Sequence, residues 1–282
     1  MYKRQYGDWL YDLEKFSFFC NAALSALPVI GFKPDVVHCH DWQTGLIPVY
    51  LKDRFRGGEF FANMKSVMTI HNLKFQGVWD VKTIQRFSML PDYYFTPDKL
   101  EAYKDGNMLK GGIVFADAIT TVSQTYAEEI KMPFYGEGLD GLMRARSGDL
   151  RGIVNGIDYD EFNPETDKLI AQPYNARNFR KEKGKNKKQL QAQLGLPVDE
   201  KKFMVGIVSR LTDQKGLDLV QCVMDELCSD DMQFVVLGTG DEKYENMFRH
   251  YDWKYHDRVS AQIYYSNDMS HKIYAGCDAL LM

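Results

Sequence analysis

Two short runs in the first half of the chain each deliver polar side chains that could bind a ligand. Residues 36–42 read Val-Val-His-Cys-His-Asp-Trp, which places Asp41 at the end of the run. Residues 66–72 repeat this design and end on His71 and Asn72. In open α/β sheets, ligands bind beyond the carboxyl ends of the strands. If both runs are strands of one sheet, these side chains lie where a ligand would bind.

The second half of the chain carries a different chemistry, because two cations lie between an apolar run and a helical segment. Arg210 and Lys215 are five residues apart in this turn. Helix N-termini attract anions, and two added cations make a diphosphate the natural ligand. Residues 236–241 form a second turn of this kind, in which Gly238 and Gly240 let a ligand approach the backbone.

The elements that must position these residues alternate along the chain. In the first half we expect strands at 36–40, 66–70, 118–122 and 151–154, and helices at 44–54, 108–115 and 124–131. In the second half we expect helices at 175–194, 217–227, 242–250 and 268–275, and strands at 203–208, 233–237, 259–263 and 279–282. Such alternation is typical of a parallel sheet with helices on both faces. We therefore predict an α/β fold of two doubly wound domains.

Three local details of this pattern can be tested. The strand at 36–40 is expected to be buried, Thr44 is a plausible cap for the helix that follows it, and Ser123 should cap the helix at 124–131.

A polar, turn-rich connection follows Gly156. We therefore divide the chain into domains 1–157 and 158–282.

Composition excludes several classes of protein. The chain has 282 residues, of which 45% are hydrophobic, so a sizeable core can form. Its net charge is 35 − 39 = −4, which argues against a nucleic-acid or membrane-surface partner. The five cysteines are scattered without a CxxC pair, as is usual for reduced thiols in the cytosol. The most apolar stretch, 16–32, is interrupted by polar residues and preceded by acidic ones. We expect a cytoplasmic location.

Together these segments resemble the bacterial glycogen (starch) synthases of glycosyltransferase family 5. The matching segments are 34–42, 69–73 with 76–77, 109–113, 118–123, 154–158 with 163–167, and 209–218. They occur in the family's order over about residues 6–282. Each motif alone is weak, but six in register are a specific signal.

The resemblance implies a GT-B fold, in which two Rossmann-like domains face each other across a cleft. It also implies retaining transfer of glucose from ADP-glucose to the non-reducing end of an α-1,4-glucan such as glycogen or a maltooligosaccharide. By similarity, Arg210 and Lys215 hold the donor diphosphate and stabilise the departing ADP. Tyr265 would stack on adenine, and Gly238 and Gly240 would line the nucleotide pocket.

The resemblance also assigns residues to the transferred sugar. His71 and Asn155 would contact the glucose, and Asp41 would lie beside it near the acceptor. His71, Asp41, Arg210 and Lys215 are thus the catalytic candidates. The remaining substrate-binding candidates are Asn72, Gln76 and Gly77.

Two family features are absent from the sequence. One is a Lys-Thr-Gly-Gly loop after the first strand, and the other is an acidic loop beyond the last strand. We therefore expect an internal fragment with both domains incomplete. Residues 1–157 would be the C-terminal part of the acceptor-side domain, and 158–282 the N-terminal part of the nucleotide-sugar-binding domain. We expect no activity from the fragment alone.

A zinc site is the first alternative. His38 and His40 share one face of the expected strand, and His71 follows the neighbouring run. However, Cys39 points to the other face, and no carboxylate lies at metal-ligand spacing on a helix. We expect neither a metal nor another cofactor.

Other candidates also have structural alternatives. Asp41 could cap the following helix, Asn155 could form a turn, and Tyr265 could belong to the core. The basic run 180–188 is expected to be an exposed helix and loop.

Three alternative functions remain. A related GT-B enzyme could use UDP-glucose, and a non-catalytic remnant could bind glucan. A nicotinamide-dependent oxidoreductase is disfavoured, because no GxGxxG motif follows a strand with an acidic residue about 20 positions later.

Overall fold

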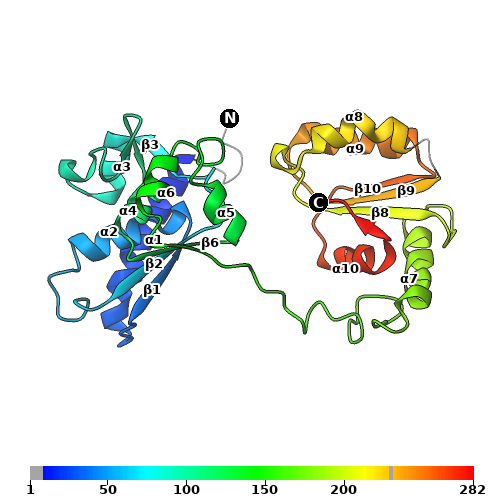
Figure 1. Ribbon diagram of the computed structural model, residues 1–282, viewed down its shortest axis with the longest axis horizontal. Helices are drawn as coiled ribbons and strands as arrows, with labels where there is room; N and C mark the ends of the chain where they lie inside the picture. Colours follow the sequence, from blue (N-terminus) through cyan, green and yellow to red (C-terminus); the bar gives the residue numbers. More distant parts are fainter. Residues whose placement is uncertain (1–8, 229–230) are drawn as a thin grey trace. The chain divides into compact units, whose positions relative to one another are not determined.

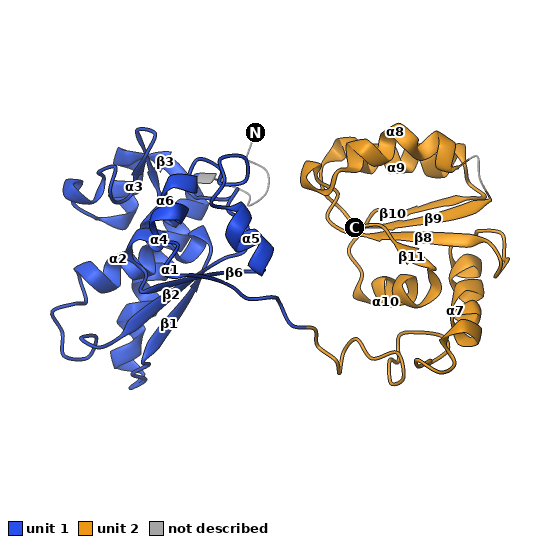
Figure 2. Ribbon diagram, in the orientation of Figure 1, with its two compact units in different colours: residues 1–156 blue, residues 157–282 orange. Residues whose placement is uncertain are grey.

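The computed structural model describes residues 9–228 and 231–282, so residues 6–8, where the family resemblance begins, lie outside the described part. The chain divides into two compact units, 1–156 and 157–282 (Figure 2). This division lies one residue before the boundary drawn from the sequence. Each unit is built on a sheet of four parallel strands, as the alternation of strands and helices predicts.

The sheet of unit 1 has the strand order β1-β2-β6-β7 (Figure 1). These strands are β1 (Val36–His40), β2 (Lys65–Ile70), β6 (Ala118–Thr121) and β7 (Leu150–Gly152). Because all pairings are parallel, the carboxyl ends of the strands meet at one edge. That edge carries the ends of β1 and β2, which precede Asp41 and His71.

The expectation that the strand at 36–40 is buried is wrong. Cys39 is fully buried, but Val36, His38 and His40 are exposed on the opposite face. The cause is position, because β1 is the outermost strand of its sheet and this face of it lies open.

Several helices surround this sheet. They are α1 (Trp9–Val29), α2 (Leu46–Asp53), α3 (Val81–Ser88), α4 (Met108–Phe115), α5 (Gln124–Glu129) and α6 (Asp140–Ala145), with short 3₁₀ turns η1 (Trp42–Thr44) and η2 (Asp92–Tyr94). A small antiparallel sheet has the order β3 (Val78–Asp80), β5 (Asp105–Asn107) and β4 (Glu101–Ala102). Neither α1 nor this small sheet was expected. Among the described residues, no helix combines the length and apolar character needed to span a bilayer.

The helix expected at 44–54 is divided into η1 and α2. Thr44 does not cap it, because its hydroxyl donates to the carbonyl oxygen of His40 at 2.8 Å. Gly45 occupies the cap position instead. The cap expected at Ser123 is confirmed, since its side-chain oxygen accepts the backbone N–H of Tyr126 at 2.9 Å.

The sheet of unit 2 has the order β10-β9-β8-β11, again entirely parallel. Its strands are β8 (Phe203–Val208), β9 (Met232–Leu237), β10 (Val259–Gln262) and β11 (Ala279–Leu280). Its helices are α7 (Phe179–Gln193), α8 (Leu217–Leu227), α9 (Glu242–Lys254) and α10 (Asn267–Gly276), with a 3₁₀ turn η3 (Asp213–Lys215). Figure 1 shows α8 and α9 on one face of this sheet and α7 and α10 on the other.

The side chains of the central strand β9 are buried on both faces of the sheet, so helices must pack against both faces. Phe234 and Val236 pack into the core beneath α8 and α9, whereas Val235 and Leu237 pack into the core beneath α7 and α10. Alternate side chains of a strand point to opposite faces, so an uninterrupted apolar run is buried on both sides. The bounds predicted for β8, α8 and α4 are confirmed.

Some predicted ends are wrong. The strands expected at 151–154 and 279–282 end at Gly152 and Leu280, where exposed residues follow. The helix expected from residue 175 begins at Phe179. The Asn175 side chain explains this delay, because its oxygen accepts backbone N–H groups of Arg177 and the following residue and holds a turn there.

The segment after the division belongs to unit 2 through contacts with α10. The carboxylate of Asp167 lies 2.7 Å from Nδ1 of His271, and both side chains are buried. The ring of Phe162 stacks on the same imidazole with centroids 5.0 Å apart. Through these contacts with His271, residues 158–173 are held against α10 of unit 2.

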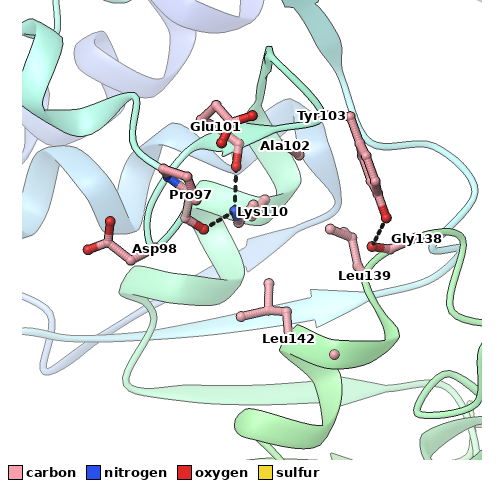
Figure 3. Close-up of a pocket in the computed structure, with 10 residues that line it drawn as sticks. Pro97, Asp98, Glu101, Ala102, Tyr103, Lys110, Gly138, Leu139 and Leu142 are labelled. Carbon is pink, nitrogen blue, oxygen red and sulfur yellow. Dashed lines mark hydrogen bonds between the residues drawn. The ribbon is translucent and has the colours of Figure 1, made fainter.

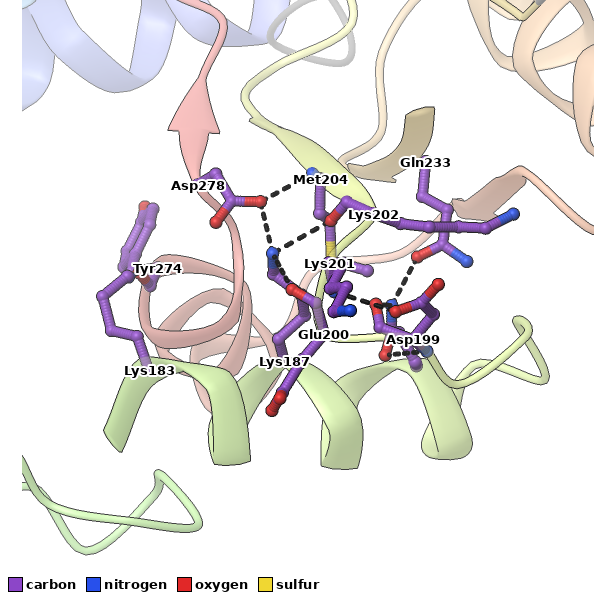
Figure 4. A network of polar contacts seen from close by, with 11 residues as sticks. Lys183, Lys187, Asp199, Glu200, Lys201, Lys202, Met204, Gln233, Tyr274 and Asp278 are labelled. Carbon is purple, nitrogen blue, oxygen red and sulfur yellow. Dashed lines mark hydrogen bonds and ion pairs between the residues drawn. The ribbon is translucent and has the colours of Figure 1, made fainter. Parts of the chain in front are cut away.

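The basic run at 180–188 is only partly exposed, contrary to expectation. Lys187 is 5% exposed, and its ammonium donates to the carbonyl oxygens of Glu200 and Lys202 at 3.1 and 2.9 Å (Figure 4). It also pairs with Asp278 at 2.5 Å. The same carboxylate accepts the backbone N–H of Met204 at 2.8 Å. A buried charge requires such partners, and here they join α7 to β8 and to the residue before β11.

Candidate functional site

Asp41 and His71 are brought together at the edge of the unit 1 sheet. A carboxylate oxygen of Asp41 accepts the backbone N–H of His71 at 2.7 Å. Asp41 has φ 55° and ψ −171°, a region that non-glycine residues rarely adopt and that is found at functional sites. The alternative that Asp41 caps the following turn is wrong, because its side chain makes no cap hydrogen bond and contacts His71 instead.

Three imidazoles form a row on the exposed face next to Asp41. Nδ1 of His40 lies 3.0 Å from Nε2 of His71, and the rings of His38 and His40 lie 4.3 Å apart. Nε2 of His38 lies 2.6 Å from the hydroxyl of Thr69. Partial burial holds the pKa of His40 below its usual value, and repulsion from the His38 and His71 rings adds to this, whereas Asp41 opposes it. His40 therefore resists protonation.

This row offers little to a metal ion. Two of its nitrogens face each other across the contact between His40 and His71, and one nitrogen of His38 is engaged by a hydroxyl. Cys39 lies on the opposite face, where burial raises the pKa of its thiol to about 12. Within residues 9–228 and 231–282, no group of three or more His, Cys, Asp or Glu side chains is arranged to hold a metal.

The loop that follows His71 is held by its own side chains. The Asn72 side chain accepts a backbone N–H two residues later at 3.0 Å, an Asx turn. The Gln76 amide nitrogen donates to the carbonyl oxygens of Leu73 and Glu137 at 3.1 and 2.9 Å. Its oxygen accepts from the Asn107 amide at 2.6 Å. Gln76 thus uses both of its N–H groups to hold the loop.

Gly77 ends this loop against the indole of Trp42. Its φ is +64°, and a Cβ added there would lie 2.6 Å from a Trp42 ring carbon. Its carbonyl oxygen accepts the N–H of Met108 at 3.0 Å, so the loop covers the start of α4. Sequence reasoning missed Asn107, which caps α4 as well as holding Gln76. An asparagine directly before a helical pattern is an N-cap signal that could have identified it.

Asn155 is not brought into contact with His71. It follows β7, which lies two strands from β2, and its side chain is exposed. The alternative that Asn155 forms a turn is wrong, since residues 153–158 adopt neither helix, strand nor turn. The last tie to the sheet is Ile153, whose N–H donates to the carbonyl oxygen of Thr121 at 2.8 Å.

Arg210 and Lys215 lie in the connection between β8 and α8 of unit 2. Both side chains are exposed, and among the described residues neither has a hydrogen-bond or ion-pair partner. Lys215 ends the turn η3, and Gly216 in the left-handed conformation is the N-cap of the eleven-residue helix α8. The two cations are therefore available to an anion near a helix N-terminus.

The glycine turn after β9 lies directly beside this connection. The N–H of Leu211 donates to the carbonyl oxygen of Thr239 at 2.9 Å. A Cβ on Gly238 would lie 1.9 Å from the carbonyl oxygen of Ser209, and one on Gly240 would lie 2.2 Å from that of Leu211. Both glycines are thus required by packing between the two turns. The structure brings Gly238 and Gly240 to the segment that carries Arg210.

Tyr265 follows β10 at the same edge of the unit 2 sheet. The N–H of Gly238 donates to the carbonyl oxygen of Gln262 at 3.1 Å, which ties the glycine turn to the end of β10. Tyr265 is 89% exposed, so the alternative that it belongs to the core is wrong. Its ring is open to a ligand.

Comparisons with known proteins agree with this architecture. Residues 1–145 match the family model described as starch synthase catalytic domain. A curated glycogen synthase from Lachnospira eligens is 73% identical over 275 residues, which cover 97% of this chain and 58% of that protein. A glycogen synthase from Lachnoclostridium phytofermentans is 64% identical and covers 99% of this chain and 58% of its own length. The chain spans somewhat more than half the length of these relatives.

A solved structure gives the same result for the fold. The catalytic domain of starch synthase IV from Arabidopsis thaliana, bound to ADP and acarbose, aligns with a TM-score of 0.89 and 33% identity. The alignment covers 98% of this chain and 57% of that one. The predicted fold class, α/β of the GT-B type with two Rossmann-like units, is confirmed.

Proposed function

The chain belongs to the family of starch synthase catalytic domains, and on that basis we propose that it takes part in the reaction of a glycogen synthase. In this reaction glucose moves from ADP-glucose to the non-reducing end of an α-1,4-glucan with retention of configuration. One observation carries the proposal: the side chains of Arg210 and Lys215 lie exposed and, within the described residues, unpaired in the connection that leads from β8 to α8. Two cations so placed suit a diphosphate.

Unit 2 would hold the nucleotide. Charge develops on the diphosphate as it leaves, so Arg210 and Lys215 would act mainly on the transition state. The exposed ring of Tyr265 would stack on adenine, and the turn with Gly238 and Gly240 would pass beside the nucleotide. The Arabidopsis structure, which has ADP bound, supports this assignment by similarity.

Unit 1 would hold the transferred sugar. The His71 imidazole would contact the glucose, and Asp41, fixed by the His71 N–H, would lie beside it near the acceptor. Asn155 would contact the glucose from the end of β7, and Asn72, Gln76 and Gly77 would shape the loop around it. The Arabidopsis structure also has acarbose, a carbohydrate, bound, which supports a glucan as the second partner.

We propose further that the reaction needs no metal and occurs in the cytoplasm. The two cations and the helix start would supply the positive charge that a divalent ion supplies in other phosphate sites. Transfer should therefore survive dialysis against EDTA. A strict requirement for added Mg²⁺ or Mn²⁺ would contradict this part of the proposal.

The test is a chimera in which this chain replaces the matching segment of the Lachnospira eligens relative. The chimera should move labelled glucose from ADP-glucose to glycogen, and UDP-glucose should serve as a poorer donor. Preference for UDP-glucose would favour the related GT-B enzyme. Binding of glycogen without transfer from either donor would favour the non-catalytic glucan-binding remnant.

A further inference from the structure

The main chain around His71 is fixed by contacts that do not involve its imidazole ring. Asp41 accepts the backbone N–H of His71 at 2.7 Å. The loop that follows is tied down by Gln76, whose amide nitrogen donates to the carbonyl oxygen of Glu137 at 2.9 Å. These hydrogen bonds place the Cα of His71, but they leave the rotation of the ring undetermined.

The turn that follows Glu137 is fixed in the same way, from the side of a pocket of unit 1 that it lines (Figure 3). The Tyr103 hydroxyl donates to the carbonyl oxygen of Gly138 at 3.0 Å. The Lys110 ammonium points to the carbonyl oxygen of Pro97 in the same view (Figure 3). These polar groups are used to hold the main chain, and none of them reaches the ring of His71.

The ring of His71 has one hydrogen-bond partner within residues 9–228 and 231–282, and this partner is another imidazole. Nε2 of His71 lies 3.0 Å from Nδ1 of His40, and the two ring planes are tilted by 32°. At this distance one nitrogen carries the proton and the other accepts it. Nδ1 of His71 makes no hydrogen bond within the described residues, and the side chain is exposed.

His40 is itself held in place. The Thr44 hydroxyl accepts its backbone N–H at 2.6 Å and donates to its carbonyl oxygen at 2.8 Å. Its ring lies 4.3 Å from the ring of His38, whose Nε2 is 2.6 Å from the hydroxyl of Thr69. The hydroxyl of Thr120 lies 2.6 Å from that of Thr69 and continues this support to β6. A side chain fixed in this way can orient the ring to which it is hydrogen-bonded.

The direction of the hydrogen bond follows from the tautomers that it requires. If His40 donates, both rings must carry their proton on Nδ1. If His71 donates, both rings carry it on Nε2, the tautomer that a neutral histidine side chain prefers in water. The second direction is therefore the more stable one for two exposed rings. Partial burial and the neighbouring rings hold the pKa of His40 below its usual value, so near pH 7 its Nδ1 is free of a proton and can accept.

This direction gives His71 a defined chemistry toward a ligand. Its Nε2–H is engaged by His40, so Nδ1 presents a lone pair, which accepts a hydrogen bond and cannot donate one. A sugar hydroxyl has a proton to give, whereas an ionised diphosphate has none. The ring of His71 is thus matched to a sugar and not to the phosphates of the donor.

We propose that His40 is a positioning residue for His71: it accepts the Nε2–H of His71 and leaves Nδ1 of that ring as the acceptor for a hydroxyl group of the transferred glucose. His40 does not touch the sugar. The identity of the sugar rests on the proposed function, whereas the hydrogen bond between the two rings does not.

The first test locates the protons by NMR of the chain labelled with ¹⁵N-histidine, at pH 8. Among the six histidines, His40 and His71 should each show a protonated Nε2 and an unprotonated Nδ1. In His40→Leu, the His71 nitrogen shifts should move toward those of a mixture of tautomers. His40→Asn has the shape of leucine but keeps an amide oxygen near the position of Nδ1, so it should retain the wild-type shifts.

The matched control is His256→Leu, which removes an exposed histidine of unit 2 and should leave the His71 shifts unchanged. A proton on Nδ1 of His71 in the wild type would overturn the proposal. Shifts of His71 that are the same in His40→Leu and the wild type would also overturn it.

The second test is glucose transfer by the chimera. His40→Leu should lower kcat about 3- to 10-fold, the size of one neutral hydrogen bond, and His256→Leu should not change it. His40→Asn should stay within about twofold of the wild type, a rescue that a role in packing alone would not give. Equal losses in His40→Leu and His40→Asn would contradict the positioning role. A chimera without any transfer would contradict the proposed function, and the nitrogen shifts of the chain would still decide the role of His40.

Discussion

The two units place their candidate residues at the same edge of similar sheets but hold them differently. In unit 1, Asp41 accepts the His71 N–H, and Gln76 is tied to its neighbours through both ends of its amide. In unit 2, Arg210 and Lys215 are exposed and, among the described residues, unpaired. The proposed sugar-binding residues of unit 1 are thus held in place without a ligand, whereas the two cations of unit 2 would gain their partners from the proposed diphosphate. Substitutions of Asp41 or Gln76 should therefore cost stability, whereas those of Arg210 and Lys215 should cost only binding and rate.

The largest expected effect is on the rate of the chimera. Arg210→Ala or Lys215→Ala should lower glucose transfer by about 10²–10³-fold, by analogy with deletion of an oxyanion-stabilising group. The urea midpoint should stay unchanged, because neither exposed side chain has a hydrogen-bond or ion-pair partner among the described residues. The measurements are initial rates with ADP-glucose and urea denaturation of the same proteins.

The control for these variants is Lys181→Ala, which removes an exposed cation of α7. It should leave both rate and stability unchanged. Near-normal transfer in both Arg210→Ala and Lys215→Ala would remove the diphosphate assignment. A large loss of stability in either one would break the contrast between the units.

The next largest effect is on the stability of unit 1. Gly77→Ala should lower the free energy of unfolding by about 2–4 kcal/mol, since it combines backbone strain with overpacking against Trp42. Gly31→Ala is the matched control, because Gly31 has a similar φ of +68° but nothing within 4 Å of an added Cβ. It should cost only about 1 kcal/mol. Urea denaturation monitored by tryptophan fluorescence measures both, and equal losses would show that the Trp42 contact does not constrain Gly77.

The contrast between the units also shows what sequence can predict. Strand ends that deliver Asp41, His71 and Arg210 are recognisable, because an apolar run followed by polar residues is a local pattern. The bounds of α8 are predictable because the spacing of its apolar residues is also a local pattern. The sequence does not predict whether Tyr265 is exposed, because a single residue beyond a strand shows no alternation of apolar and polar side chains.

Contacts between distant segments could not be predicted. Lys187 lies in a basic run, and only the fold brings Asp278 to it across 91 residues of sequence. Gln76 is a binding candidate by sequence, and only the fold shows that its amide nitrogen also donates to the carbonyl oxygen of Glu137. In α1, Phe18 and Phe19 are exposed although their neighbour Cys20 is buried, so the apolar pattern does not mark the buried face.

A smaller effect is expected at Asp41. Asp41→Ala removes the acceptor of the His71 N–H and should lower the free energy of unfolding by about 1–2 kcal/mol. Asp41→Asn keeps an oxygen in the same place and should lose less than about 0.5 kcal/mol. If transfer by the chimera falls in both variants, the charge of Asp41 is needed as well as its hydrogen bond. Equal stability of Asp41→Ala and the wild type would show that unit 1 is not organised through this contact.

The smallest effect concerns pH. Burial and the neighbouring His38 and His71 rings hold the pKa of His40 below its usual 6.5 in the folded chain. Between that lowered value and 6.5, the unfolded chain therefore binds more protons at this residue, so its contribution makes stability fall as the pH drops through this window.

His40→Gln should remove this contribution and flatten the loss of stability between pH 7 and pH 5. The measurements are urea midpoints of both proteins at pH 8, 6.5 and 5. At pH 8 the imidazole is neutral in both states, so the difference there reports only the lost packing and the lost hydrogen bond to His71. Subtracting it isolates the protonation of His40. A variant whose stability falls as steeply as that of the wild type would show that the row of imidazoles in unit 1 does not disfavour the charged form of His40.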